Sequence, residues 1–452
     1  MASAFAVLVA PRSAAAQTTA LQSNAVTNVS CAPSQNGTGH MICGEELRMP
    51  TGNTIFGGLS WQAQPTTTGA PGTEAPGTVH SSNITLPAGG FTGTPGCSQT
   101  ADGSGSVICA VEGPGNGLYG IAIHPQPTQT TSALMPLLVP GMVISGVPGL
   151  ILSAYPCTPD APCNIMGSVA SAPSCAPTTG AGTQVICAVV VNIQNVKGAA
   201  QPFLVGVAFD PRAPVVAGSN PAIAALPYTT TYMSNPSCVG VVDHSATSPQ
   251  NAGNGFAACG IVVMTPAPWS TPTIFGVAFD PRSGYARGGL VISTATGFAG
   301  DPSCATPRDG STEVLCAIGA GTGSGFGNGN FSTLLGFGFD TVARTTTPLR
   351  TLGAAPSGFW TGVGCASPNV TTAASSTLCA ATTTTNQTFG VLFDPRTTTA
   401  PRFSSASAFS PPNGFPMTSP PACVSLNIVS NAISCAVVDS GKETWAFSLP
   451  SP

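Results

Sequence analysis

The sequence carries very little charge. Lysine, arginine, aspartate and glutamate make up 6% of the 452 residues, and the net charge is −4, whereas about 25% of the residues of an ordinary soluble domain are charged. No basic stripe runs along the chain, so the electrostatic surface that a phosphate backbone requires is missing and we expect no nucleic-acid partner. Because a nearly neutral surface repels its own copies only weakly, self-association is possible.

The sequence also lacks the common motifs of catalysis and cofactor binding. No Gly-x-Ser-x-Gly elbow, phosphate-binding loop or dinucleotide fingerprint stands in a strand-to-helix context. None of the four histidines has a metal-ligand partner at close spacing; they are His40, His80, His124 and His244. We therefore expect no metal site and no cofactor, and the sequence names no catalytic residue.

Helical periodicity is absent as well. With 54 glycines and 44 prolines the chain is rich in turns, which favours an all-β fold. The uncharged stretch Leu134–Tyr155 is long enough to span a bilayer, but it contains Pro136, Pro140 and Pro148, which would interrupt a helix. We interpret it as a β-strand with an adjoining apolar loop and expect no transmembrane anchor.

Cysteine, by contrast, is plentiful, and fourteen of the sixteen cysteines form a repeating pattern. First cysteines of successive pairs are 58 to 78 residues apart, and five of the seven pairs have a separation of twelve. This period is too short for a row of immunoglobulin sandwiches and suits one blade of a β-propeller. The pairs are Cys31 with Cys43, Cys97 with Cys109, Cys175 with Cys187, Cys238 with Cys259, Cys304 with Cys316, Cys365 with Cys379 and Cys423 with Cys435.

Each cysteine pair marks a β-hairpin. A glycine stands at the midpoint of several pairs, as at Gly37, Gly103 and Gly310, and short β-rich runs flank it. Folding about this midpoint brings the two cysteines opposite each other on adjacent strands, at the separation that a disulfide requires. We therefore expect one disulfide within each blade.

A third strand follows each hairpin. It reads Gly-Val-Ala-Phe-Asp-Pro-Arg at 206–212 and 276–282, with weaker copies in the other units. The alternation of bulky and small residues is typical of a strand packed between neighbouring blades. The aspartates that end four of these strands are Asp210, Asp280, Asp340 and Asp394. We interpret them as caps of their own turns, with a functional ring of aspartates as the weaker alternative.

A fourth strand precedes each first cysteine, for example at Gly289–Ser293 and in its near copy Gly141–Ser145. Four antiparallel strands in each of seven units predict a single all-β, seven-bladed propeller over residues 17–452. An insertion around residues 150–172 contains an eighth cysteine pair, Cys157 and Cys163. We interpret this pair as a disulfide that closes a small surface finger, and a recognition knob is the alternative.

The first sixteen residues resemble a signal peptide. An apolar run at residues 4–10 is followed by Ser13-Ala14-Ala15-Ala16, which fits cleavage after Ala16, although the positively charged first segment is missing, as in a truncated start. Paired cysteines persist in oxidising compartments. We therefore expect a secreted protein, extracellular or periplasmic.

The segment 95–119 resembles the repeat of secreted bacterial seven-bladed propeller lectins of the fucose-binding, Photorhabdus-lectin type. The matching positions are Pro95-Gly96-Cys97, then 107–113 with Cys109, then Asn116-Gly117-Leu118-Tyr119, and all seven units share the cysteine and third-strand positions. The resemblance implies a radial propeller with sugar sites between blades. Such lectins repeat tryptophans in every blade, whereas this chain has only four, Trp61, Trp269, Trp360 and Trp445, so no lectin site residue carries over.

The sequence therefore predicts a secreted, non-enzymatic binding module that recognises a glycan or a surface protein. A self-assembling extracellular surface or filament protein is one alternative, and a hydrolase or lyase with an axial carboxylate site is another. The carboxylates outside the Asp-Pro turns include Asp102, Glu112, Glu313 and Asp439, and the sequence ranks no two of them above the rest. Exposed aromatic side chains at blade junctions would favour binding, and two converging carboxylates would favour an enzyme.

Overall fold

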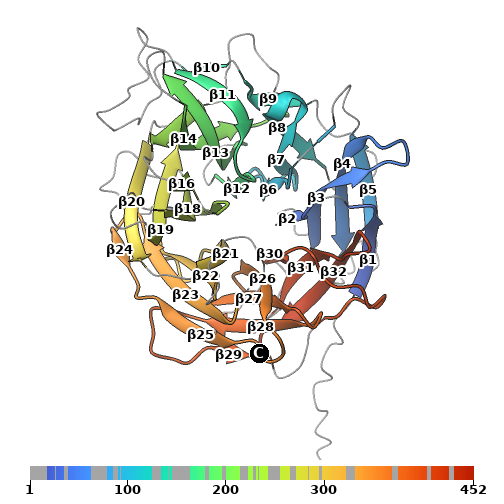
Figure 1. Ribbon diagram of the computed structural model, residues 1–452, viewed down its shortest axis with the longest axis vertical. Coiled ribbons are helices and arrows are strands. Elements are labelled where there is room, and N and C mark those ends of the chain that lie inside the picture. Colours follow the sequence, from blue (N-terminus) through green and yellow to red (C-terminus); the bar gives the residue numbers. More distant parts are fainter. Residues whose placement is uncertain are drawn as a thin grey trace, which may run out of the picture.

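The computed structural model describes residues 18–25, 27–34, 39–62, 79–84, 90–91, 93–124, 134–140, 142–144, 163–178, 183–195, 200–213, 222–227, 231–232, 234–242, 255–264, 271–282, 285–294, 298–321, 331–368, 375–404, 409–426 and 432–452. These residues form seven antiparallel sheets arranged radially around a common axis, with the sheets in chain order around the ring (Figure 1). The predicted all-β, seven-bladed propeller is confirmed. The part of the chain described contains no α-helix, and accordingly no helix long and apolar enough to cross a membrane.

The first three blades follow one another from the N-terminal side. Blade 1 consists, from its inner to its outer strand, of β2 (Ser30–Pro33), β3 (His40–Arg48), β4 (Thr54–Gln62) and β5 (Val79–Ile84). In the same order, blade 2 is β6 (Gly96–Gln99), β7 (Val107–Gly113), β8 (Gly117–Ile123) and β9 (Met135–Leu138), with the 3-10 turn η1 (Pro114–Asn116) between β7 and β8. Blade 3 is β12 (Ser174–Pro177), β13 (Val185–Asn195), β14 (Gln201–Phe209) and β15 (Ala222–Pro227), and β11 (Cys163–Val169) and β10 (Val143–Ile144) extend it along β13.

The remaining four blades complete the ring. Blade 4 is β17 (Ser237–Val242), β18 (Gly255–Met264), β19 (Pro272–Asp280) and β20 (Tyr285–Thr294), with β16 (Thr231–Tyr232) also paired to β18. Blade 5 is β21 (Phe298–Ala305), β22 (Val314–Ala320), β23 (Thr333–Asp340) and an outer strand in two parts, β24 (Thr345–Thr346) and β25 (Arg350–Ala354). Blade 6 is β26 (Trp360–Ala366), β27 (Thr377–Thr383), β28 (Thr388–Phe393) and β29 (Arg402–Phe403). Blade 7 is β30 (Ala422–Val424), β31 (Ala432–Val438), β32 (Glu443–Pro450) and β1 (Thr18–Ser23).

The ring is closed by strands from both ends of the chain. β1 pairs antiparallel with β32, from Thr18 opposite Phe447 to Ser23 opposite Glu443, and Figure 1 shows the blue strand lying beside the red one. The chain then crosses to blade 1, where the Arg48 amide donates to the carbonyl of Asn24 at 3.0 Å. Opening the ring therefore requires the loss of a complete strand pairing.

Seven disulfides join the inner strand of each blade to its second strand, as the cysteine repeat predicts. In every blade the two cysteines are direct partners in the antiparallel register, with Cα atoms 4.0 or 4.1 Å apart. A loop of this length contributes about 3 kcal/mol on the chain-entropy model. From blade 1 to blade 7 the bonded pairs are Cys31 with Cys43, Cys97 with Cys109, Cys175 with Cys187, Cys238 with Cys259, Cys304 with Cys316, Cys365 with Cys379 and Cys423 with Cys435.

The expected eighth pair is only partly covered by the structure. Cys157 lies outside the described residues, so its pairing with Cys163 stays a prediction. Cys163 begins β11, where it is the register partner of Asn195 in blade 3. The described end of the insertion therefore extends a blade sheet.

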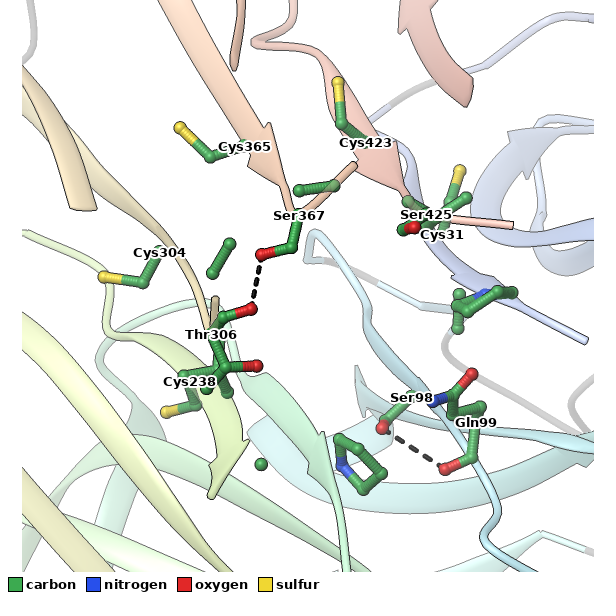
Figure 2. Close-up of a pocket in the computed structure, with 18 of the residues that line it drawn as sticks. Cys31, Ser98, Gln99, Cys238, Cys304, Thr306, Cys365, Ser367, Cys423 and Ser425 are labelled. Carbon is green, nitrogen blue, oxygen red and sulfur yellow. Dashed lines mark hydrogen bonds between the residues drawn. The ribbon is translucent and has the colours of Figure 1, made fainter. Parts of the chain in front are cut away.

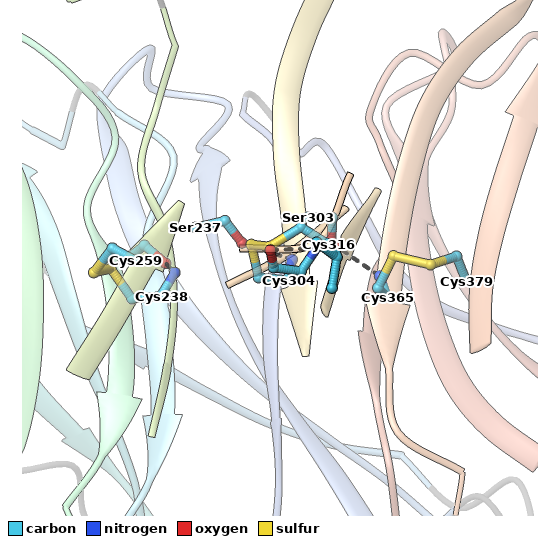
Figure 3. Close-up of a disulfide and its surroundings, with 11 residues drawn as sticks. Ser237, Cys238, Cys259, Ser303, Cys304, Cys316, Cys365 and Cys379 are labelled. Carbon is cyan, nitrogen blue, oxygen red and sulfur yellow. Dashed lines mark hydrogen bonds between the residues drawn. A yellow bond between two sulfur atoms is a disulfide. The ribbon is translucent and has the colours of Figure 1, made fainter. Parts of the chain in front are cut away.

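Hydrogen bonds link neighbouring blades around the axis. The serine before a first cysteine accepts a hydrogen bond from the backbone N–H of the first cysteine in the next blade, and Figure 3 shows two successive links. The four pairs are Ser30 with Cys97, Ser174 with Cys238, Ser237 with Cys304 and Ser303 with Cys365, at 2.8 to 3.0 Å. Gly96 and Gly364 replace the serine where a Cβ would overlap the carbonyl of the next blade.

The glycine and phenylalanine of the third strand form the packing between blades. Phe339 of blade 5 lies on Gly276 of blade 4, where an added Cβ would be 2.6 Å from the ring. The same contact joins Phe279 to Gly206, Phe393 to Gly336 and Phe209 to Gly120. The alternation of bulky and small residues in the motif is therefore explained, because each ring fills the space left by a glycine in the preceding blade.

The fourth strands are only partly as predicted. The segment Gly289–Ser293 lies within β20, as expected. Of Gly141–Ser145 the structure describes residues 142–144, and these include the strand β10 but do not form the outer strand of blade 2. That strand is β9, which ends at Leu138, and a turn follows in which the Met142 amide donates to the Val139 carbonyl at 2.9 Å. Pro140 has no N–H to continue the pairing, and β10 beyond the turn pairs with β11 in blade 3.

Candidate functional site

The propeller has two chemically different faces. We call the face on which the inner strands begin the top face and the face on which they end the bottom face. Because neighbouring strands are antiparallel, each second strand ends, and each third strand begins, on the top face. The top face therefore carries the turns between second and third strands, and the bottom face carries the cysteine hairpin turns and the Asp-Pro-Arg motifs.

The Asp-Pro-Arg motifs on the bottom face are structural, as interpreted from the sequence. Asp210 accepts a hydrogen bond from the Arg212 amide at 2.9 Å and is paired with the Arg212 guanidinium at 3.0 Å. The guanidinium also reaches Asp102 of the preceding blade at 2.9 Å. Arg396 repeats this arrangement with Asp394 in its own blade and with Asp309 in the preceding blade. These arginines therefore link adjacent blades through ion pairs.

The four carboxylates considered for an axial active site do not come together. Asp102 and Glu313 lie on the bottom face of blades 2 and 5, each paired with an arginine of the next blade. Partial burial would raise the pKa of Asp102, but hydrogen bonds from Thr100 and Ser104 and the charge of Arg212 outweigh burial and hold the pKa below its usual range.

The other two carboxylates belong to the top face. Asp439 is fully buried in blade 7 and accepts hydrogen bonds from the Asn413 amide at 2.6 Å and from the Trp445 indole at 2.9 Å. Glu112, in blade 2, lines a cavity of about 430 Å³ together with Asn28 and Asn235. No two of the four candidates thus lie on the same face of the same or adjacent blades.

Two further carboxyl groups, Glu45 and Glu46, were not singled out from the sequence. Both lie on β3 and are buried, with 0% and 2% of their surface exposed. Burial raises the pKa of Glu45 to about 7, although Thr444 donates a hydrogen bond to it from blade 7. Burial also raises the pKa of Glu46 to about 7, and the charge of Glu112 adds to this increase. Both groups therefore belong to the buried interior of blade 1.

The axial opening of the top face is lined by the residues that precede the first cysteines. Prolines predominate in this cavity of about 450 Å³: Pro95, Pro173, Pro236, Pro302, Pro420 and Pro421. Asn235 joins three blades here, because it accepts from the Ala172 amide at 2.8 Å and donates to both carboxylate oxygens of Asp301 at 2.8 and 2.7 Å. These hydrogen bonds link blades 3, 4 and 5 at the edge of the axial opening.

Exposed apolar side chains gather on the top face of three consecutive blades. Phe359 of blade 6 is 51% exposed, Phe415 of blade 7 is 49% exposed and Met49 of blade 1 is 38% exposed. The remaining large apolar side chain with comparable exposure among the described residues is Val291, on the outer strand β20. An exposed aromatic ring offers a large apolar contact area, and aromatic rings are common in binding sites.

Phe359 immediately precedes the inner strand β26 and is hydrogen-bonded to the turn between β27 and β28. Its amide donates to the Thr384 hydroxyl at 3.0 Å, and its carbonyl accepts from the Thr384 amide at 2.8 Å. Ser357 lies beside it, within 2.7 Å of the Thr385 hydroxyl and 2.8 Å of the Gln387 side-chain oxygen. The backbone of Phe359 is therefore fixed to a turn whose side chains are uncharged hydroxyl and amide groups.

Phe415 lies in the segment before the inner strand β30 and packs against the turn between β31 and β32. An added Cβ at Gly441 would be 2.7 Å from the Phe415 ring, which places the ring against this turn. The Phe415 amide donates to Asn413 at 3.0 Å, and the Asn413 side chain donates to the Glu443 carboxylate at 2.8 Å. An aromatic ring, an amide and a carboxylate thus share one exposed site.

The described tryptophans and His124 do not form such sites. Trp61 and Trp360 are fully buried, and the indole N–H of Trp445 donates a hydrogen bond to Asp439. His124 is within 2.8 Å of the Ser106 hydroxyl, and burial, together with the charge of Arg212, lowers its pKa. His244 and Trp269 lie outside the described residues, and among those described no group of residues could hold a metal ion.

The bottom end of the axis contains a separate cavity of about 300 Å³. Figure 2 shows Cys31, Cys238, Cys304, Cys365 and Cys423 among the residues around it, together with the polar side chains of Ser98, Gln99, Ser367 and Ser425. Ser367 donates a hydrogen bond to the Thr306 carbonyl across the junction of blades 6 and 5. All seven inner strands contribute to the wall of this cavity.

Comparisons with known proteins define the fold and leave the function open. No protein-family model and no curated protein matches the sequence. Among solved structures, the BP39L lectin from Burkholderia pseudomallei is similar, with a TM-score of 0.52 and 11% identity over 95% of this chain and 96% of the lectin.

Two other solved structures have lower similarity. The fucose-specific lectin from Aleuria aurantia has a TM-score of 0.38 and 10% identity, over 79% of this chain and 95% of the lectin. The NanB sialidase from Streptococcus pneumoniae has a TM-score of 0.44 and 8% identity, over 96% of this chain and 93% of the sialidase. At 11% identity, the similarity to the BP39L lectin shows the fold alone, and one fold can host many functions.

Proposed function

We propose that this protein is a secreted glycan-binding propeller that binds sugars on its top face. The observation that carries the proposal is the pair of half-exposed rings, Phe359 and Phe415, each in the segment before the inner strand of its blade and each against the turn between the second and third strands. The lectin-type repeat and the fold shared with a bacterial lectin are consistent with this proposal.

The chemistry around the two rings fits a sugar. The face of an aromatic ring packs against the apolar C–H face of a sugar ring, and neighbouring polar groups bond the sugar hydroxyls. Ser357 and Gln387 supply such groups beside Phe359, and Asn413 and Glu443 supply them beside Phe415. Phenylalanine takes the stacking role for which tryptophan is used in the lectins that the repeat resembles.

Secretion is part of the same proposal. Seven disulfides, one in each blade, are stable in an oxidising compartment. We propose that residues 1–16, which lie outside the described residues, are removed as a signal peptide and that the mature propeller begins at Gln17. The four carboxylates Asp102, Glu112, Glu313 and Asp439 do not lie close to one another, as a pair of catalytic carboxylates would. This arrangement favours a binding module over a hydrolase.

A glycan array tests the proposal. The oxidised protein from Gln17 onward should bind a restricted set of glycans, and Phe359→Ala and Phe415→Ala should each lower the affinity about tenfold, as expected for the loss of one aromatic contact of about 1.4 kcal/mol. Val291→Ala removes an equally exposed apolar side chain from an outer strand and should leave binding unchanged. A blank array, or equal losses in all three variants, would overturn the proposal.

A further inference from the structure

A cavity of about 300 Å³ lies between blades 5 and 6, near the bottom face and the outer edge of the ring. Its walls come from the first residues of β25 in blade 5 and from the turn between β28 and β29 in blade 6. It shares no described lining residue with either axial cavity. It is therefore a separate space at a junction between two blades.

Two contacts between the blades hold the walls of this cavity in place. The ring of Phe393, which lines the cavity, lies on Gly336 of blade 5, where an added Cβ would be 2.9 Å from the ring. Phe403, two residues after the lining residue Pro401, lies on Gly353 of blade 5, where an added Cβ would be 2.7 Å from its ring. The cavity is thus formed by parts of both blades that are packed against each other.

Arg350 supplies the positive charge in the wall. Its side chain makes no hydrogen bond and no ion pair in the part of the chain that the structure describes. The Nε atom is buried without a partner, whereas the terminal nitrogens Nη1 and Nη2 are not buried. These two nitrogens form the outer edge of the planar guanidinium, and they can donate to both oxygens of a carboxylate at once.

Asp394 supplies the negative charge in the wall, but it is not a partner of Arg350. Its Oδ1 atom accepts hydrogen bonds from the Arg396 amide at 3.0 Å and from the Arg396 Nε atom at 2.9 Å. Its Oδ2 atom accepts from Nη2 of the same arginine at 3.1 Å. Both oxygens are therefore occupied within the turn of blade 6, and the Arg350 guanidinium is left for an acid from outside the chain.

The rest of the wall is partly polar and partly apolar. Thr351, Thr398 and Thr399 are exposed, and their hydroxyls make no hydrogen bond within the described part of the chain. Leu352 and Pro401 add apolar surface. A guanidinium beside hydroxyls and carbon surface suits an anion that is carried on a carbon skeleton better than a bare inorganic ion. A volume of about 300 Å³ is at the lower limit of ligand pockets, so it limits the ligand to the size of a monosaccharide.

We propose that this cavity binds the carboxylate of a small organic acid. Nη1 and Nη2 of Arg350 donate to the two carboxylate oxygens, and the carbon skeleton packs on the apolar wall beside the threonine hydroxyls. The acid is either a sugar acid such as a uronate or an aliphatic acid, since both carry the same group. The site is separate from the top-face rings Phe359 and Phe415, so its failure would leave the glycan-binding proposal intact.

Isothermal titration calorimetry of the oxidised protein with sodium glucuronate, sodium butyrate, sodium sulfate and glucose, at an ionic strength held constant with sodium chloride, tests the proposal. We expect at least one of the two organic acids to bind at least tenfold more tightly than sulfate, and glucose not to bind at this site. Glucuronate at least tenfold tighter than butyrate identifies a sugar acid, the reverse order identifies an aliphatic acid, and equal affinities identify recognition of the carboxylate alone.

Arg350→Gln should weaken the binding of the organic acid at least tenfold, because hydrogen bonds to a charged group are lost. Its midpoint of guanidinium unfolding should equal that of the wild type, since the Arg350 side chain bonds nothing in the described chain. Arg344→Gln is the matched control: Arg344 is exposed on the turn between β23 and β24 of the same blade and does not line the cavity. This variant and Phe359→Ala should both keep the wild-type affinity for the acid.

Three results would overturn the proposal. They are wild-type protein that binds neither acid more tightly than sulfate, an Arg350→Gln variant that keeps the wild-type affinity, and equal losses of affinity in Arg350→Gln and Arg344→Gln. Should Arg350→Gln fail to fold, Arg350→Lys retains the charge without the planar fork, and we expect it to bind the acid at least threefold more weakly than the wild type. Wild-type affinity in that variant would contradict a site in which two nitrogens bind the carboxylate.

Discussion

Glu45→Gln is expected to stabilise the protein by about 3 kcal/mol at pH 8. Glu45 is fully buried, and its Oε1 atom has no hydrogen-bond partner in the part of the chain described. Its pKa is raised from 4.5 to about 7, and a tenfold change in proton affinity corresponds to about 1.4 kcal/mol. Glutamine keeps the acceptor for Thr444 and removes the charge that must otherwise be buried above pH 7.

The sign of the pH dependence follows from proton binding. Between pH 4.5 and 7 the folded protein holds a proton on Glu45 that the unfolded chain has lost, so the free energy of unfolding falls as the pH rises through this range and levels off above it. At pH 4, where Glu45 is protonated in both states, the variant and the wild type should be equally stable. Guanidinium unfolding of the oxidised proteins at pH 4, 6 and 8 measures this difference.

Asp102→Asn provides a control, because its expected change in stability at pH 8 has the opposite sign to that of Glu45→Gln. The pKa of Asp102 is held low in the folded protein by Thr100, Ser104 and Arg212, so its carboxylate stabilises the fold above the unfolded pKa, and the variant should lose stability at pH 8. Glu45→Gln with no gain at pH 8, or with the same gain at pH 4 and pH 8, would contradict the assignment of Glu45 as a buried titrating group.

Phe339→Ala is expected to destabilise the protein by about 3 to 5 kcal/mol, because it leaves a cavity between blades 4 and 5. Gly276→Ala should cost about 1 to 3 kcal/mol, since its Cβ would lie 2.6 Å from that ring. When both changes are combined, the alanine at 276 should cost almost nothing, because the ring that it would strike is gone. Unfolding free energies of the two single variants and the double variant give the coupling.

Gly390→Ala is the matched control for this packing. It stands at the same place in the repeat, but blade 7 presents Leu449 there, and an added Cβ would be at an ordinary contact distance of 3.4 Å. We expect little loss of stability in this variant. Additive losses at positions 276 and 339 would show that the glycine and the ring are not packing partners across the blade junction.

The repeats in the sequence were sufficient to predict the propeller architecture. The cysteine pairs predicted the hairpins because directly opposed residues on adjacent strands are at the separation of a disulfide, and the pairs are register partners in every blade, as Cys304 and Cys316 are in blade 5. The third-strand motif predicted the packing between blades because its glycine and its phenylalanine are packing partners. The Phe339 ring of one blade occupies the space that the missing side chain of Gly276 leaves in the preceding blade. Both signals are repeated, and repetition distinguishes them from chance.

Features that occur once were not predictable in this way. β1 has no cysteine and no Gly-x-x-Phe pattern, so its pairing with β32 could not be read from the repeat. Phe359 and Phe415 are two of twenty phenylalanines. Only the fold distinguishes them from the phenylalanines of the core, because it places them beside turns of the top face. Glu45 is buried because blade 7 closes over it, which is a contact between residues almost 400 positions apart.

The most direct test of the glycan-binding account is a crystal structure of the oxidised protein soaked with the glycan that binds most tightly on the array. The account predicts a sugar ring stacked on Phe359 or Phe415, with its hydroxyls hydrogen-bonded to nearby polar groups, such as Gln387 beside Phe359 or Asn413 and Glu443 beside Phe415. A sugar bound on the outer strands, or no sugar on the top face at a concentration well above its dissociation constant, would contradict it.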